Sequence, residues 1–217
     1  MTISQLSKML EGSLVSIELT ILSVCVGIFF AFFIAIMRIS ESKVLQKIAW
    51  IYIWIIRGTP LLLQIMVVYF AIPIMAKDLL GISLALPQFT SAVIALTMNV
   101  AAYSAEIIRA GIESIDKGQM EASKALGMNR RQAMIKVIIP QTIKRVIPSF
   151  CSEFTMILKD SSLVSVIGMS ELMKVSKQFA ASGAWGFYFY AGAIYLALTT
   201  VISVVFDKLE KRAGIYE

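Results

Sequence analysis

Two carboxylates in a largely apolar stretch are the residues of this chain with the clearest chemical potential. Glu153 and Asp160 are seven residues apart, so about two helical turns place both on one face. Asn99 lies in another apolar stretch. Ionisable groups inside hydrophobic spans are costly and mark functional sites by default. Such carboxylates could hold an ammonium or guanidinium group, or serve as proton or ion sites.

Each of these residues also has a purely structural interpretation. Asp160 could pair with its neighbour Lys159 or cap the segment that follows, and Asn99 could make a hydrogen bond between helices, which membrane helices use commonly. Glu106 lies at the end of its apolar stretch, where a charge at the membrane surface is expected. We therefore carry Glu153, Asn99 and Asp160 forward as the candidate substrate-binding residues.

The composition indicates a membrane protein. The chain has 217 residues, of which 58% are hydrophobic and 16% charged, whereas soluble domains average about 45–50% apolar and about 25% charged. Four stretches of at least 19 residues carry no charge: 19–37, 58–76, 79–105 and 179–206. A spanning helix needs about 20 apolar residues, and backbone groups inside lipid must bond within their own segment. Each stretch is therefore predicted to be a helix that crosses the membrane.

A fifth span is predicted where the candidate carboxylates lie, because their flanks are too apolar for a soluble linker. The prediction is thus an all-α membrane protein, one transmembrane domain over residues 1–217 with five transmembrane helices. Gly58-Thr59-Pro60 is a possible break in the second helix, with Arg57 interpreted as reaching the membrane interface. The predicted spans are about 14–38, 48–76, 87–108, 146–169 and 183–206.

The distribution of basic residues predicts the orientation. With the N-terminus outside, fourteen of the twenty Lys and Arg residues fall in the internal segments 38–47, 109–145 and the tail after Asp207. Internal loops of membrane proteins carry this excess, so the N-terminus is predicted outside and the C-terminus inside. The net charge of +6 is therefore mainly a topology signal, and no nucleic-acid partner is expected.

Several kinds of catalytic chemistry are excluded or unsupported. The chain contains no histidine, which excludes Ser-His and Cys-His nucleophile pairs and most zinc sites. Cys25 and Cys151 have no metal or redox spacing. The phosphate-binding pattern Gly-x-x-x-x-Gly-Lys-Ser/Thr is absent from the sequence. We expect no catalytic residue, no metal and no cofactor in this chain.

The loop 109–145 is too long for a simple connector, since loops above about 12–15 residues usually have structure or function of their own. Apolar residues recur in it at helix-like intervals, Gly127 breaks the pattern, and a second helical stretch runs into Pro140. This predicts two short helices joined by a glycine turn. Composition alone favours an amphipathic segment on the membrane surface over a docking site for a partner.

This loop resembles the EAA loop of ABC importer permeases. The residues that carry the resemblance are Glu121-Ala122-Ser123, then Gly127, then Val137-Ile138-Ile139-Pro140. The spacing fits, and Ser123, Val137 and Ile139 are conservative departures from Ala, Ile and Leu. Three further stretches resemble the polar amino-acid uptake subfamily (histidine, glutamine and arginine type), and they are Arg57 to Gln64, Tyr103 to Gly111 and Leu158 to Leu163.

The resemblance implies a type I ABC importer permease in a bacterial cell membrane. It implies that the loop 109–145 forms a coupling helix that sits in a cleft on a cytoplasmic ATPase subunit, and that two such ATPase subunits bind the ATP. It also implies a second permease subunit, identical or not, an extracellular solute-binding protein and contact with membrane lipid. The residues assigned to the ATPase coupling loop on this basis are Glu121, Ala122, Ser123, Gly127 and Pro140.

The function expected is that of the transmembrane subunit of an ATP-driven amino-acid importer. Substrate-contacting positions in this subfamily lie on the spans that flank the EAA loop, where the candidate residues fall. Two acidic side chains favour a polar amino acid, and among these a cationic one. The alternative is a secondary transporter or ion channel that uses the buried carboxylates, although the internal repeats common in such folds are not evident.

Overall fold

The computed structural model describes residues 1–212, and helices make up most of this part of the chain, which contains no strand. The long helices are α1 (Ile3–Arg38), α2 (Lys43–Gly58), α5 (Gln88–Glu113), α8 (Ile139–Asp160) and α10 (Gly186–Arg212). The shorter ones are α3 (Leu61–Met66), η1 (Val67–Ala71), α4 (Ile72–Leu80), α6 (Lys117–Ala125), α7 (Arg130–Ala133), η2 (Met134–Ile138), η3 (Ser161–Ile167) and α9 (Leu172–Ala180).

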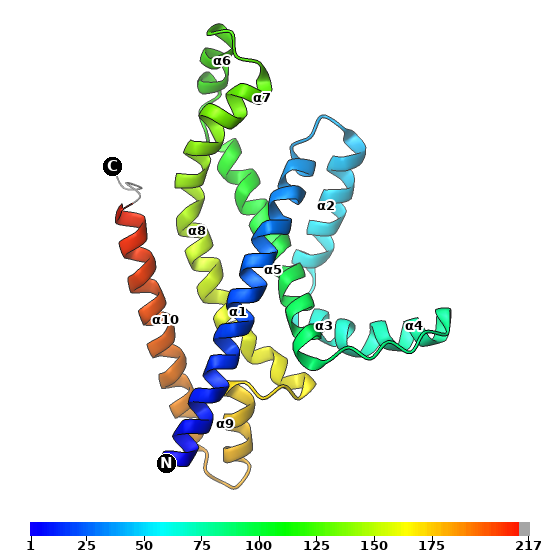
Figure 1. Ribbon diagram of the computed structural model, residues 1–217, viewed down its shortest axis with the longest axis vertical. Helices are drawn as coiled ribbons and strands as arrows, with labels where there is room; N and C mark the ends of the chain where they lie inside the picture. Colours follow the sequence, from blue (N-terminus) through cyan, green and yellow to red (C-terminus); the bar gives the residue numbers. More distant parts are fainter. Residues whose placement is uncertain (213–217) are drawn as a thin grey trace.

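The long helices α1, α5, α8 and α10 run along the length of the molecule (Figure 1). Helices α6 and α7 form one end, and α9 lies at the other, near the N-terminus. The turn between α1 and α2 and the final turns of α10 point toward the α6–α7 end. The three basic segments found in the sequence therefore lie toward the same end of the fold.

Four helical segments are long and apolar enough to cross a membrane: Ile3–Arg38, Leu61–Leu80, Gln88–Glu113 and Phe187–Lys211. They overlap four of the five predicted spans, and α1 begins earlier than predicted. The fifth predicted span, 146–169, overlaps α8 and then η3 up to the left-handed Gly168. This segment is not among the four that are apolar enough to cross. The total number of crossings and their direction remain predictions.

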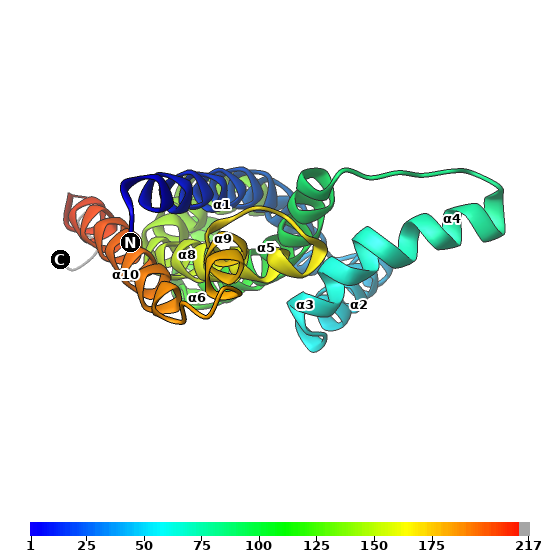
Figure 2. The same cartoon turned by 90° about the horizontal axis from the view of Figure 1, so that it is seen from below.

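The predicted span 48–76 is divided in two. Helix α2 ends at Gly58, Thr59 is extended with φ −121° and ψ 146°, and α3 begins at Leu61. Pro60 causes the break, because it has no N–H and its ring disfavours a helical residue before it. Helices α3 and η1 pack against α5 through the buried Ile65 and Val68, and α4 then extends away from the other helices (Figures 1 and 2).

Small residues bring α1 and α5 together. The buried face of α1 includes Gly27, Ala31 and Ala35, and α5 buries a run of alanines and serines that includes Ala101 and Ala105. Membrane helices associate through such residues because short side chains let the backbones approach closely. This packed pair is the framework that positions α2 on one side and α8 on the other.

Two segments of wide π-helix share one local cause. In each, an isoleucine N–H bonds to the carbonyl five residues earlier: Ile72 to Val67, and Ile139 to Met134. A proline follows directly in both cases, Pro73 and Pro140. A proline ring clashes with the carbonyl four residues before it, and a widened turn relieves that clash. Pro140 thus shapes the junction between the predicted coupling loop and α8.

Candidate functional site

Glu153 lies in the interior of α8 and is only 6% exposed. Its Oε1 atom is buried and receives no hydrogen bond from any group in residues 1–212. The charged groups that act on it electrostatically are Asp160, which repels its charge, and Arg57, which attracts it. Glu153 on α8 is therefore within electrostatic range of a basic group at the end of α2, although Arg57 itself is exposed.

Asp160 is the last residue of α8 and is partly buried. Its side chain makes no capping hydrogen bond to η3. Within residues 1–212 it also forms no ion pair, although the charge of Lys159 lies near it. In the described residues Asp160 therefore neither caps η3 nor pairs directly with Lys159, which were its two structural interpretations.

Asn99 is 4% exposed on α5 and makes the hydrogen bond between helices that was its structural alternative. Its side-chain Nδ2 donates to Oε1 of Gln64 on α3 at 3.3 Å. The geometry therefore connects Asn99 to the helix break, and it does not by itself give Asn99 a free polar atom for substrate.

Gln64 replaces the hydrogen-bond donor that is missing at Pro60. Its Nε2 donates to the carbonyl oxygen of Ile56 at 2.7 Å and to the carbonyl and hydroxyl oxygens of Thr59 at 3.1 and 3.0 Å. In a continuous helix the residue at position 60 would donate to Ile56, but proline has no N–H. The side chain of Gln64 supplies that donor, and Asn99 orients it. The sequence contained the signal, a glutamine four residues after the proline, but its role was not predicted.

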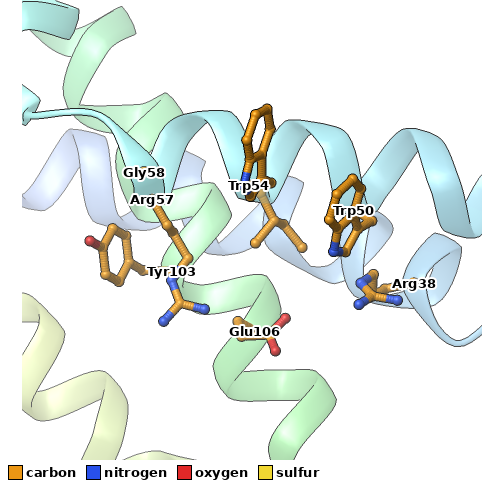
Figure 3. A pocket seen from close by; sticks show the side chains of 8 residues that line it. Arg38, Trp50, Trp54, Arg57, Gly58, Tyr103 and Glu106 are labelled. Carbon is orange, nitrogen blue, oxygen red and sulfur yellow. The ribbon is translucent and has the colours of Figure 1, made fainter.

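Figure 3 shows a cavity of about 390 Å³ where α2 faces α5 and the end of α1. The guanidinium of Arg57 lies 5.0 Å from the centre of the Tyr103 ring, a geometry typical of a cation–π contact. The interfacial interpretation of Arg57 did not predict this contact. The cavity combines two guanidinium groups, one carboxylate and aromatic walls, and its lining residues are Arg38, Trp50, Ile53, Trp54, Arg57, Gly58, Tyr103 and Glu106.

Glu106 lies at the edge of this cavity and is held by ion pairs within α5. Its Oε1 accepts from Nε of Arg109 at 2.8 Å, and Arg109 also pairs with Glu113. A carboxylate engaged in this way is less available than Glu153.

The predicted coupling loop contains two short helices joined by a glycine turn. Asp116 caps α6 by accepting from the N–H of Gly118 at 2.6 Å. Gly127 ends it with φ +83°, a left-handed conformation that only glycine adopts without strain. Asn129 then starts α7 through a reciprocal capping pair with Gln132. This confirms the helix, glycine turn and second helix expected from the sequence pattern.

The assigned EAA-type residues differ in exposure. Glu121, Ala122, Gly127 and Pro140 are exposed, whereas Ser123 is buried and bonds to the carbonyl of Gln119 at 2.7 Å. Beside Gly127 the end of α6 also presents an apolar side chain to solvent, since Leu126 is 81% exposed. The end of the molecule formed by α6 thus exposes the carboxylate of Glu121 and the apolar side chain of Leu126.

No group of three or more His, Cys, Asp or Glu side chains in residues 1–212 is arranged to hold a metal ion. Cys25 and Cys151 are not bonded to each other or to another cysteine. The predictions of no metal and no cofactor remain predictions.

Curated proteins similar to this chain are permeases of amino-acid transport systems. The chain is 36% identical over 214 residues to the arginine transport system permease protein ArtQ of Bacillus subtilis. The match covers 97% of this chain and 94% of ArtQ. It is 34% identical to the putative glutamine transport system permease protein GlnP of Rickettsia typhi (94% and 91% covered). It is 35% identical to the L-cystine permease protein TcyB of Bacillus subtilis (94% and 86%).

Solved structures agree with these similarities. An amino acid ABC transporter crystallised with histidines matches with a TM-score of 0.86 at 38% identity, covering 98% of this chain and 100% of that one. The MetNI methionine ABC transporter, in inward-facing conformations, matches with a TM-score of 0.80 at 16% identity (98% and 99% covered) and shows the shared fold alone. A family model described as "Binding-protein-dependent transport system inner membrane component" matches residues 24–215. The chain therefore belongs to the family of inner membrane components of binding-protein-dependent transport systems.

Proposed function

We propose that this chain is the permease subunit of an ATP-driven importer of polar amino acids, and that a cationic amino acid is its substrate. The family and the fold make the chain a non-catalytic membrane component of an ABC transporter. The curated relatives are named for arginine, glutamine and cystine transport. Our choice among these substrates depends on the carboxylates of α8.

The observation that carries the substrate class is the buried carboxylate of Glu153, which lacks a donor among residues 1–212. A buried charge without a partner is costly, and an ammonium or guanidinium group would supply the missing donors. Asp160, two turns along the same helix, adds negative charge. Arg57, which interacts electrostatically with Glu153, is suited to the carboxylate of the amino acid.

In this proposal Asn99 does not contact the substrate directly, and it is the weakest of the three candidates. It orients Gln64, which bonds to the backbone at the end of α2. Its hydrogen bond to Gln64 holds the end of α2 that carries Arg57. We therefore propose that Asn99 positions the substrate path and that Glu153 and Asp160 contact the substrate.

The family implies a dimeric permease that works with ATPase and binding-protein partners. In our proposal the chain crosses the membrane five times with its N-terminus outside, and the path lies between two permease subunits, identical or not. The α6 end, with exposed Glu121 and Leu126, docks on the ATPases. ATP-driven closure of the two ATPases then moves α6 and changes which side of the membrane the path opens to.

Competition for uptake tests the substrate class. We would measure uptake of labelled arginine by the complete transporter in vesicles, with unlabelled lysine, glutamine and cystine as competitors. The variant Glu153→Gln is expected to weaken arginine transport about tenfold or more, the loss of one charge-assisted contact. The matched control Glu11→Gln alters an exposed carboxylate of α1 and should leave uptake unchanged. Unaltered affinity and selectivity in Glu153→Gln would refute the assignment.

A glycine substitution tests the coupling proposal. Gly127→Val forces a β-branched residue into a left-handed conformation, which costs about 1–3 kcal/mol. Stimulated transport should be abolished while membrane insertion persists. Gly192→Val on α10 is the control, because a Cβ there meets nothing within 4 Å and its φ is not positive. Normal ATPase association and uptake in Gly127→Val would contradict a coupling role. Uptake without any ATPase would instead favour the secondary transporter.

A further inference from the structure

A long apolar groove lies between α1, α5 and the η2–α8 segment. Its volume is about 560 Å³, within the range of about 300–1,000 Å³ typical of small-molecule sites. Almost all of its lining is aliphatic or aromatic. Several of the lining side chains are strongly exposed, including Phe32 (46%), Ile36 (48%), Ile135 (53%) and Ile143 (53%). An exposed apolar surface of this kind marks a membrane or ligand contact.

One end of this groove is polar and basic. A second hollow of about 350 Å³ continues from it, shares Ile36 and Arg131 with it, and adds the polar side chains of Ser40, Glu41 and Arg130. Arg130 pairs with Glu41. Arg131 is exposed and has no ion pair within residues 1–212. The apolar groove therefore ends at a guanidinium group that has no anionic partner in the described chain.

We propose that this groove binds an anionic phospholipid, with an acyl chain between α1 and α8 and the phosphate on Arg131. The two parts of the site match the two parts of such a lipid. A guanidinium forms strong, directed hydrogen bonds with phosphate oxygens, and aliphatic side chains match the acyl chain. The site lies toward the basic end of the molecule, where anionic headgroups are attracted.

Charge and position favour a lipid over a protein segment as the occupant. The groove opens on exposed side chains of α1 and α8, in a chain whose family resides in the inner membrane. The candidate substrate carboxylates Glu153 and Asp160 do not line it. A lipid in this place contacts α1, α5 and α8 together, so its binding stabilises their packing near the α7–η2 junction.

Native mass spectrometry of the complete transporter tests the proposal. The purified complex is exposed separately to phosphatidylglycerol, phosphatidylcholine and inorganic phosphate, and the bound mass is measured. We expect retention of phosphatidylglycerol, weaker retention of phosphatidylcholine and none of phosphate alone. Arg131→Gln should weaken phosphatidylglycerol binding about tenfold, as expected for one charge-assisted hydrogen-bonded contact. Lys136→Gln removes a nearby exposed charge that does not line the groove and should have no effect.

A second pair of variants tests the acyl-chain part of the site. Ile135→Gln places an amide in the groove and should lower retention of the lipid. Ile48→Gln changes the same residue type at the same exposure of 53% outside the groove and should not. Equal retention in Arg131→Gln and Lys136→Gln would overturn the site, and so would equal binding of phosphate alone. A photoreactive acyl chain should label α1 and α8, and labelling elsewhere only, or a cross-linked protein segment in the groove, would also overturn it.

Discussion

Two buried glutamates in this chain have opposite surroundings. Glu153, 6% exposed in the interior of α8, has an Oε1 atom that no donor in residues 1–212 reaches. Glu171, fully buried before α9, accepts hydrogen bonds from the N–H groups of Met173 and Lys174, both at 2.7 Å. The hydroxyl of Tyr195 donates to it at 3.1 Å. The same side chain is thus satisfied at one site and unsatisfied at the other.

The surroundings of Glu171 are built for close packing. A Cβ atom at Gly12 of α1 would lie 3.0 Å from the backbone of Glu171 and Leu172, so α1 and the start of α9 meet through a glycine. Burial raises the pKa of the Glu171 carboxyl, and its two backbone N–H donors oppose that rise. Glu171 is therefore a structural cap that ties α9 to α1 and α10.

The contrast shows which buried carboxylate is a candidate for binding. A charge whose donors are all supplied by the protein contributes to the fold. A charge whose donors are not supplied destabilises the fold and is better explained by a ligand that brings them. This reasoning, and not burial alone, separates Glu153 from Glu171.

Removal of the satisfied glutamate should have the largest effect. Glu171→Ala deletes the cap of α9 and leaves the Tyr195 hydroxyl without its acceptor, a loss of about 2–4 kcal/mol in stability. Thermal unfolding of the purified complex would show it as a lowered melting temperature. If Glu171→Ala unfolds at the temperature of the unaltered protein, Glu171 is not a structural cap and the contrast fails.

Gln64 extends the comparison to a buried amide that is satisfied by backbone carbonyls. Gln64→Leu removes the donor that replaces the missing N–H of Pro60, and it should destabilise the protein by about 1–3 kcal/mol. Asn99→Ala leaves that donor in place and should cost about 1 kcal/mol. Thermal unfolding of both variants measures the difference. An equal loss in the two would mean that Gln64 has no special role at the break.

The smallest stability change is expected at the unsatisfied glutamate. Glu153→Gln removes a buried charge that has no donor, so stability should stay within about 1 kcal/mol of the unaltered protein or rise. The same change at Glu171 turns one acceptor into an amide that faces N–H donors and should be clearly destabilising. Because Glu153→Gln and Glu171→Gln make the same chemical change, a difference in their thermal unfolding reports only the difference between the two surroundings. A large loss in Glu153→Gln would show that the protein itself uses this carboxylate.

Local chemistry explains why much of the fold could be predicted. Long runs without charge indicated helices in a membrane, and they overlap α1, α5, α10 and the apolar segment Leu61–Leu80. Pro60 predicted a helix break because a proline cannot donate the helical N–H hydrogen bond, whatever its surroundings. Gly127 predicted a turn because only glycine adopts a positive φ without strain. The spacing from Glu121 to Pro140 indicated the family from the sequence alone.

The partners of the site residues could not be predicted in the same way. The cation–π contact of Arg57 with Tyr103, the bond of Asn99 to Gln64 and the bond of Tyr195 to Glu171 all depend on which helices meet. Residues 171 and 195 are 24 positions apart in the chain, and no local pattern relates them.

The sequence by itself determined that this chain is a helical membrane protein with a transport-type loop, because hydrophobicity, a missing N–H and an absent Cβ act within a few residues. Only the tertiary structure decided which buried polar groups find partners on other helices. Glu153 and Glu171 are the same residue in a similar apolar context. Glu171 begins α9 and accepts two N–H groups of its own first turn, and its third donor, the hydroxyl of Tyr195, comes from α10. Glu153 lies inside a helix, where the N–H groups are already bonded, so any donor must come from packing between distant parts of the chain.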